Sequence, residues 1–154
     1  MKVPTSALAV STTRVVTVDY GLTPKQLLDL LFATRKPINA HDFIIDTLPH
    51  KGSGVKTVEV KFFNPGHVLG YDVIGHEYDE RRLIEDPYAQ IKANIDDPGL
   101  ADTHPNAIVW WHHGWRHLTI SCDKRGRNVM AGAGDNGFYN EEWYFAGVND
   151  PRRT

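Results

Sequence analysis

The 154-residue sequence has one cysteine, Cys122, and a formal net charge of −2. A single cysteine excludes an internal disulfide framework, and a chain of this length can bury a sizeable core without such cross-links. Free cysteine is typical of reducing compartments, so we expect a cytoplasmic protein. The near-zero net charge provides no basic field that would draw the protein onto nucleic acid or an anionic membrane. We therefore expect neither as a partner.

Long apolar runs are also missing from the sequence. No segment approaches the ~20 apolar residues of a membrane-spanning helix. The apolar stretch from Ala7 to Val10 is too short for the core of a secretory signal, and Pro4 interrupts the region before it. We expect residues 1–13 to form a flexible leader and residues 14–154 to form a single domain.

Local patterns predict a strand, a helix and a second strand in the first part of this domain. Residues 14–20 and 55–63 alternate between apolar and polar side chains and are rich in β-branched residues, which is typical of strands. Between them, Thr23 is a good N-cap, Pro24 suits the first helical position and Gln26 completes a capping box.

The middle of the chain, residues 67–105, is predicted to be helical or loop and polar enough to lie on the surface. Residues 78–85 are charged and fit a helix, and Asp86 with Pro87 can begin another that runs to Ile95. From Asn106 onward the pattern is all-β, with the last strand expected over 138–148. The fold class is therefore α+β: strand-helix-strand, a helical and loop region, then a C-terminal antiparallel β-meander without crossover helices.

Residues 108–122 hold three of the four Trp and three of the eight His. We expect a hairpin whose four-residue loop, 112–115, pairs Trp110 with His117 and Trp111 with Arg116. Period two then divides the stretch into two faces. The core face would carry Val109, Trp111, Leu118 and Ile120, and the other would carry Ile108, Trp110, His112, His117 and Thr119. A three-residue loop would shift the pairing by one residue.

The second face is the candidate binding surface, because amphipathic aromatics beside imidazoles suit the wall of a groove. The predicted ligand-binding or partner-binding residues are Trp110, His112, Trp115, His117 and Asn136. The last of these lies in the loop Gly132–Gly137. The leading hypothesis is a non-enzymatic binding or interaction protein that needs no cofactor and takes a protein or a small polar ligand.

Two alternatives remain open. The first is a small metal-dependent hydrolase in which His112, His113 and His117 are zinc ligands, with His104 or Asp123 completing the set. No HExxH or paired CxxC spacing supports it, and His113 falls in the expected turn. The second is a structural subunit that buries the Trp face against another copy in a homo-oligomer.

Two further motifs are better explained by structure than by chemistry. Gly132-x-Gly134-x-x-Gly137 has the letters of a dinucleotide fingerprint, but it lacks the helix that should follow. Cys122 near a histidine could be a nucleophile, yet a lone cysteine at a strand end is more often a small buried hydrophobe.

Some segments resemble a group of small uncharacterised bacterial proteins, which has no function to carry over. They are Val18-Asp19-Tyr20 with the capped helix after it, Gly126-Arg127-Asn128-Val129, and Trp143 to Val148. Residues 68–149 also resemble a C-type-lectin-like module, with a helix pair, a loop region, and a meander with an early Trp and late aromatics. The paired cysteines of extracellular C-type lectins and the Glu-Pro-Asn or Gln-Pro-Asp sugar motifs are missing. The resemblance therefore implies a fold but no calcium-dependent sugar binding.

Overall fold

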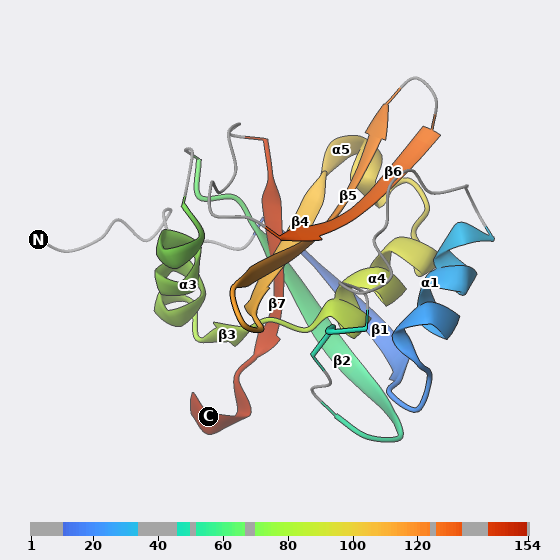
Figure 1. The fold of residues 1–154 in the computed structure, drawn as a ribbon, viewed down its shortest axis with the longest axis horizontal. Helices are drawn as coiled ribbons and strands as arrows, with labels where there is room; N and C mark the ends of the chain where they lie inside the picture. The colour runs from blue at the N-terminus through green and yellow to red at the C-terminus, as the bar shows by residue number, and fades with distance from the viewer. Residues whose placement is uncertain are drawn as a thin grey trace, which may run out of the picture.

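The computed structural model describes residues 11–33, 46–49, 52–66, 70–123, 126–133 and 142–153 (Figure 1). Its helices and strands confirm the α+β class. In chain order they are β1 (Thr12–Asp19), α1 (Pro24–Phe32), β2 (Val55–Phe63), α3 (Tyr71–Glu80), β3 (Leu83–Ile84), α4 (Pro87–Asp96), α5 (Leu100–Thr103), β4 (Asn106–Trp111), β5 (Trp115–Asp123), β6 (Gly126–Ala133), β7 (Tyr144–Asn149) and the short 3-10 helix η2 (Pro151–Arg153). None of the helices in this described part is long and apolar enough to cross a membrane.

The first three elements form as predicted. The side chain of Thr23 accepts a hydrogen bond from the Gln26 backbone N–H, and the Gln26 side chain accepts one from the Thr23 N–H. This reciprocal capping box satisfies two backbone donors that the start of a helix leaves without partners. β1 begins at Thr12, so two residues assigned to the leader belong to the sheet; residues 1–10 lie outside the described residues.

The strands form one mixed sheet in the order β1-β2-β7-β4-β5-β6, with β3 added beside β7. The predicted antiparallel meander is confirmed for β4, β5 and β6 and is wrong for the last strand. β7 returns to the centre, where it pairs antiparallel with β2 and parallel with β4. Alternation of side chains identifies a strand but does not specify which neighbour it pairs with, which explains the error.

β7 carries small residues, and these allow α3 to pack closely against it at the centre of the sheet. A Cβ added at Gly147 would lie 3.0 Å from atoms of both Leu83 and Tyr78. The Tyr78 hydroxyl donates a 2.6 Å hydrogen bond to the Ala146 carbonyl. Arg81, at the end of α3, places its guanidinium 4.2 Å from the centroid of the Phe63 ring. These contacts fix α3 on one face of the sheet.

The sheet is covered on both faces, and each face has its own core. α1 and α4 pack on one face, where the buried side chains include Leu27, Leu28, Phe62, Tyr88, Ile108, Trp110 and Leu118. α3 packs on the other face, on the opposite side of the sheet from α1 in Figure 1, where its Ile74 and Tyr78 form a core with Phe63, Leu83, Ala107, Val109 and Phe145. Below, these are called the α4 face and the α3 face.

The prediction that residues 67–105 lie on the surface is wrong for α4, although its start at Asp86 and Pro87 is confirmed. α4 packs against α1, β1, β2 and β7. Its polar residues Gln90 and Asn94 are buried, and both side-chain amides donate a hydrogen bond to Asn106 Oδ1. Asn94 also donates to the Gln90 backbone carbonyl and accepts from the Asn106 amide. Hydrogen bonding of this kind removes most of the cost of burying an amide. α4 is therefore a core helix, although its polar sequence had suggested a surface position.

The neighbouring helices also differ from the prediction. The helix expected over 78–85 lies earlier, at Tyr71–Glu80, and ends before Arg82, whose φ of 56° leaves the helical region. Leu83 and Ile84 then pair with β7 instead of continuing the helix. Residues 100–103, within the region predicted to be helical or loop, form the short helix α5.

Candidate functional site

The β4–β5 hairpin has a three-residue turn, His112-His113-Gly114, which the predicted four-residue loop does not match. Trp111 pairs with Trp115, Trp110 with Arg116 and Val109 with His117. The turn is closed by a 2.9 Å hydrogen bond from the His112 N–H to the Gly114 carbonyl. His113 has φ 54° and Gly114 has φ 126°. Glycine adopts such angles without a steric penalty, and this makes the shorter loop accessible.

The shifted register reverses the predicted roles of the two adjacent tryptophans. Trp110 is only 3% exposed and packs in the core of the α4 face, in the same cluster as Leu118. Trp111 is 66% exposed and lies on the α3 face. Trp115 and His117 share that face because they occupy alternate positions on β5. Trp110, His112 and His117 therefore do not form the single surface that was predicted. Trp111, and not Trp110, lies on the same face as His117.

His117 lies in the interior of the sheet, opposite Val109 on one side and Gly132 on the other. A Cβ added at Gly132 would lie 2.9 Å from Cε1 of the His117 ring. Burial lowers the pKa of His117 below its ordinary value, because desolvation disfavours the imidazolium form. Gly132 is thus a strand residue that makes room for a histidine. The other two glycines of the fingerprint pattern, and Asn136, lie outside the described residues.

His112 and His113 lie exposed in the turn, with ring centroids 4.9 Å apart and planes at 78°. His117 lies apart from them along the chain, within strand β5. Over the described ranges, no group of three or more His, Cys, Asp or Glu side chains is arranged to hold a metal ion.

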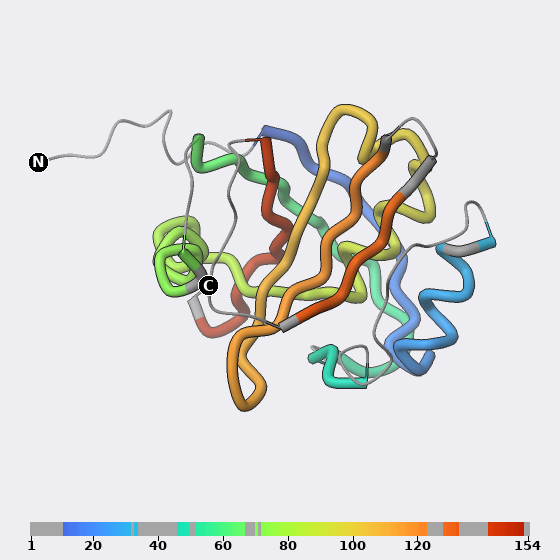
Figure 2. The backbone as a smooth tube through the Cα atoms, turned by 45° about the horizontal axis from the view of Figure 1, so that its top comes forward, coloured from blue at the N-terminus to red at the C-terminus, as the bar shows by residue number. Residues whose placement is uncertain are grey.

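A pocket of about 530 Å³ opens between α3 and the hairpin; we call it the hairpin pocket. The hairpin extends beyond the rest of the sheet in Figure 2, and α3 lies beside it. Trp111 and Trp115 meet edge to face in its wall, with centroids 5.3 Å apart and planes at 89°. The remaining lining residues are Asp72, Gly75, His76, Tyr78, Asp79, Leu83, Ile84, Glu85, Val109, Trp110, Asp150 and Arg152.

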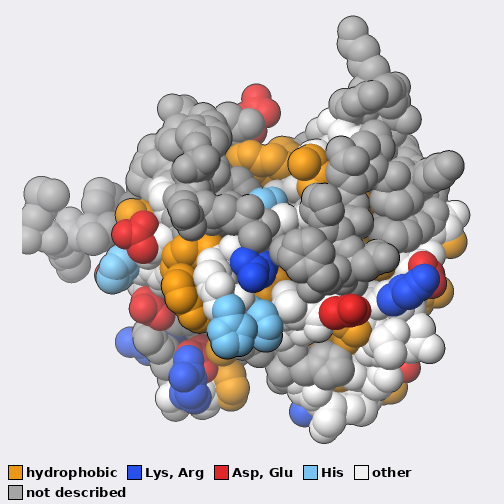
Figure 3. Space-filling model, in the orientation of Figure 1, with side chains coloured by type: hydrophobic (Ala, Val, Ile, Leu, Met, Phe, Trp, Pro, Cys, Tyr) orange, Lys and Arg blue, Asp and Glu red, His pale blue; other side chains and the backbone are white. Residues whose placement is uncertain are grey.

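Carboxylates dominate the charge of the hairpin pocket. Arg152 donates two hydrogen bonds from its guanidinium to buried Asp150, at 3.1 and 2.9 Å, and one from its backbone N–H. These bonds raise the pKa of Arg152, and Glu85 and Asp79 add smaller electrostatic contributions. In Figure 3, histidine, hydrophobic and acidic side chains lie close together over this part of the molecule.

The carboxylates that line the hairpin pocket, Asp72, Asp79, Glu85 and Asp150, were not predicted from the sequence as a site. Asp72, His76 and Asp79 stand at positions i, i+4 and i+7 of α3, so they follow one side of the helix. That spacing was a usable signal, but the helix had been placed at residues 78–85. Glu85 and Asp150 join them only through the β3–β7 pairing.

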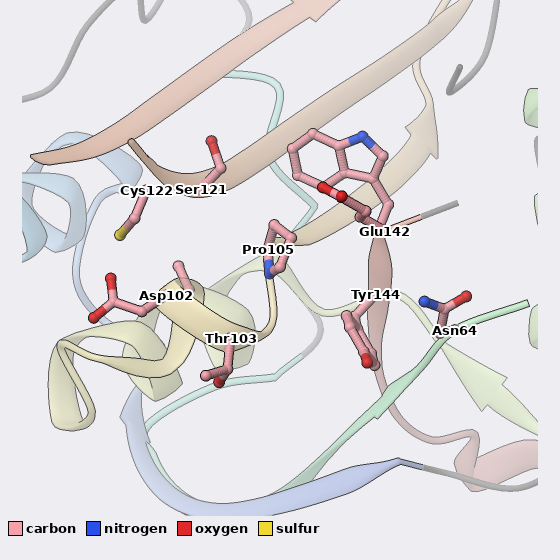
Figure 4. A pocket seen from close by; sticks show the side chains of 10 residues that line it. Asn64, Asp102, Thr103, Pro105, Ser121, Cys122, Glu142 and Tyr144 are labelled. Atoms are coloured by element: carbon pink, nitrogen blue, oxygen red, sulfur yellow. The ribbon is translucent and has the colours of Figure 1, made fainter. Parts of the chain in front are cut away.

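A second pocket, of about 670 Å³, lies where β5 ends; we call it the Cys122 pocket (Figure 4). Asp102 and Cys122 lie near each other on one side of it, and Glu142 lies on the far side. Its lining residues are Asn64, Ala101, Asp102, Thr103, Pro105, Ser121, Cys122, Glu142, Trp143 and Tyr144. The His104 ring packs against Tyr144, with centroids 4.5 Å apart and planes tilted by 54°, and its Nδ1 is 2.7 Å from the Thr103 hydroxyl. The lining described here therefore gives the Cys122 thiol no histidine base.

Comparisons of the chain with protein-family models, curated proteins and solved structures found no match. The resemblances to small bacterial proteins and to a C-type-lectin-like module stay predictions.

Proposed function

We propose that the protein is a non-enzymatic binding protein and that the hairpin pocket is its binding site. The observation that carries this proposal is the exposure of Trp111, 66% of whose side chain faces solvent beside a pocket. Tryptophan has a large apolar ring with one polar N–H, and it is enriched where proteins bind partners. Core packing accounts for Trp110 but does not account for Trp111.

The surroundings of Trp111 support binding at this end of the sheet. Its ring contacts Trp115 edge to face, so the two indoles form one aromatic surface. Apolar residues from β3 and β4 and polar groups from α3 converge on the same pocket. Ligand sites combine apolar and aromatic walls with placed polar groups that fix the ligand's orientation.

The larger Cys122 pocket has less support as the main site. Its aromatic residues, Trp143 and Tyr144, are half-buried, and the Tyr144 ring already contacts His104. Neither offers an exposed ring comparable with Trp111. We therefore place binding at the hairpin pocket.

A ligand screen by thermal denaturation tests the proposal. A compound or peptide that binds the hairpin pocket will raise the Tm of the wild-type protein, because ligands stabilise the state that binds them. The same compound will not raise the Tm of Trp111→Ala. Val15→Ala is the matched control, since Val15 is an equally exposed apolar side chain on distant β1. Hits that stabilise Trp111→Ala as much as the wild type would contradict the proposal.

Sedimentation across protein concentration separates this proposal from a homo-oligomer that buries the Trp face. A binding protein with a free pocket stays the same size at all concentrations. Self-association that Trp111→Ala abolishes would show that a second copy covers the pocket.

A further inference from the structure

The charge of the hairpin pocket selects against anions. Asp72, Asp79, Glu85 and Asp150 contribute four carboxylates to its lining, and Arg152 is the one Lys or Arg among the described lining residues. The lining therefore contains three more carboxylates than guanidinium groups. An anionic ligand would lose its hydration and meet repulsion here, whereas a cation would exchange water for carboxylates.

The indoles of the same pocket add a second preference for positive charge. The face of a tryptophan ring attracts a cation within about 6 Å of its centroid, and tryptophan is the strongest aromatic in this role. Trp115 meets Trp111 edge to face, and the Trp111 side chain remains largely exposed. This protein already uses such a contact on the same sheet face, where the Arg81 guanidinium lies over Phe63.

Arg152 is an example of a guanidinium group that these carboxylates already bind. It is bound to Asp150 and lies close enough to Glu85 and Asp79 for both to raise its pKa. Its side chain is nevertheless 76% exposed, so it lies at the edge of the pocket and does not fill it. A ligand cation could share the same carboxylates from the side of the indoles.

We infer that the hairpin pocket binds an organic cation, an alkylammonium or guanidinium group, between the Trp111–Trp115 pair and the carboxylates of α3 and Glu85. This inference rests on the proposed function and specifies its ligand class. Such a group can belong to a small molecule or to the side chain of a peptide. The shared chemistry is a positive charge spread over a group of apolar or planar shape.

Pairs of probes that differ only in charge test the inference. Choline is compared with its uncharged carbon isostere, dimethylbutanol, and the peptide acetyl-Gly-Arg-Gly-amide is compared with its citrulline counterpart. The indole N–H signals of Trp111 and Trp115 are followed by NMR during each titration. We expect shifts with choline, with the arginine peptide or with both, and none with the neutral partner. The pair that responds identifies the source of the cation.

Variants of the pocket sharpen the test. Trp111→Ala is expected to weaken binding of the cation roughly 2- to 30-fold, the range of a cation–π contact. Asp79→Asn also weakens it, and added salt weakens it further because the carboxylates are partly exposed. Arg152→Gln strengthens it, since it removes the resident guanidinium. Asp102→Asn, in the Cys122 pocket, leaves it unchanged.

The outcomes separate this inference from the proposed function. Neutral isosteres that bind as tightly as the cations would overturn the cation assignment and leave the binding pocket in place. Failure of every probe to shift either indole would also overturn the assignment, while the thermal screen decides the proposed function independently. Binding that is unaffected by Trp111→Ala and Asp79→Asn would place the cation elsewhere.

Discussion

Trp111 and Trp115 face each other directly across the last pair of the β4–β5 hairpin, with their rings edge to face at 5.3 Å. Their neighbour Trp110 points through the sheet into the opposite core. Of two consecutive tryptophans, Trp110 is therefore a core residue and Trp111 an exposed one, and the three-residue turn sets the register that assigns these positions.

Alanine substitutions at the three tryptophans should have very different effects on stability. Trp110→Ala removes a buried ring and is expected to cost about 3–5 kcal/mol. Trp111→Ala removes an exposed ring and is expected to cost no more than the contact between the rings, about 0.5–1.5 kcal/mol. Trp115 is half-buried, so the cost of Trp115→Ala should fall between those two values. Urea unfolding of the three variants measures the order; a larger loss for Trp111→Ala than for Trp110→Ala would contradict the register.

Gly132→Ala should destabilise the protein through His117. The new Cβ would lie 2.9 Å from Cε1 and 3.0 Å from Nε2 of the imidazole, so the ring must move. Overpacking of this kind costs about 1–3 kcal/mol. In a His117→Ala background the space is open and most of the cost should disappear. A double-mutant cycle by chemical denaturation measures this coupling, and equal costs in both backgrounds would rule out the contact as the cause.

Stability should decrease as the pH falls from neutral. Burial holds the pKa of His117 below its ordinary value, and burial, with help from Arg14, does the same for His104. The unfolded chain protonates these residues near pH ~6.5 and the folded protein only at lower pH. The unfolded state therefore binds more protons, and stability present above about pH 6.5 is lost as the pH falls toward the folded pKa values.

Unfolding measured at about pH 7.5 and about pH 5.5 tests this dependence, since few carboxylates titrate in that window. His117→Gln keeps a polar side chain that does not titrate and is expected to flatten the dependence. A profile of unchanged steepness in His117→Gln would show that another group is responsible.

Tyr20→Phe should cost more stability than Tyr88→Phe. The Tyr20 hydroxyl donates a 2.6 Å hydrogen bond to the buried Asp86 carboxylate, whereas the Tyr88 hydroxyl donates one of 2.8 Å to the Leu22 carbonyl. Bonds to charged groups contribute about 1.5–3 kcal/mol and neutral ones about 0.5–1.5 kcal/mol. The two variants remove the same atom from stacked rings, so denaturant midpoints compare the acceptors directly. Equal losses would mean that the carboxylate adds nothing.

Local chemistry made part of the fold predictable. Thr23 and Gln26 form a capping box because their spacing brings each side chain within reach of the other's backbone N–H. The Asp86 side chain likewise accepts a hydrogen bond from a backbone N–H in the first turn of α4. These features depend on residues within a few positions of each other.

Features that depend on distant pairing were not predictable in this way. One residue in the length of the His112–Gly114 turn exchanged the faces predicted for Trp110 and Trp111. The burial of Gln90 depends on Asn106, sixteen positions later, whose amide accepts its hydrogen bond. The hairpin pocket likewise needs β7 in the centre of the sheet, because that placement brings Asp150 and Arg152 beside α3.

Solvent access to each indole N–H tests the central claim that Trp111, and not Trp110, is available for binding. A soluble paramagnetic gadolinium chelate broadens NMR signals of exposed protons and spares buried ones. With the signals assigned by single Trp→Phe substitutions, we predict strong broadening for Trp111 and none for Trp110. Broadening of Trp110 with protection of Trp111 would restore the four-residue turn and remove the basis of the binding site.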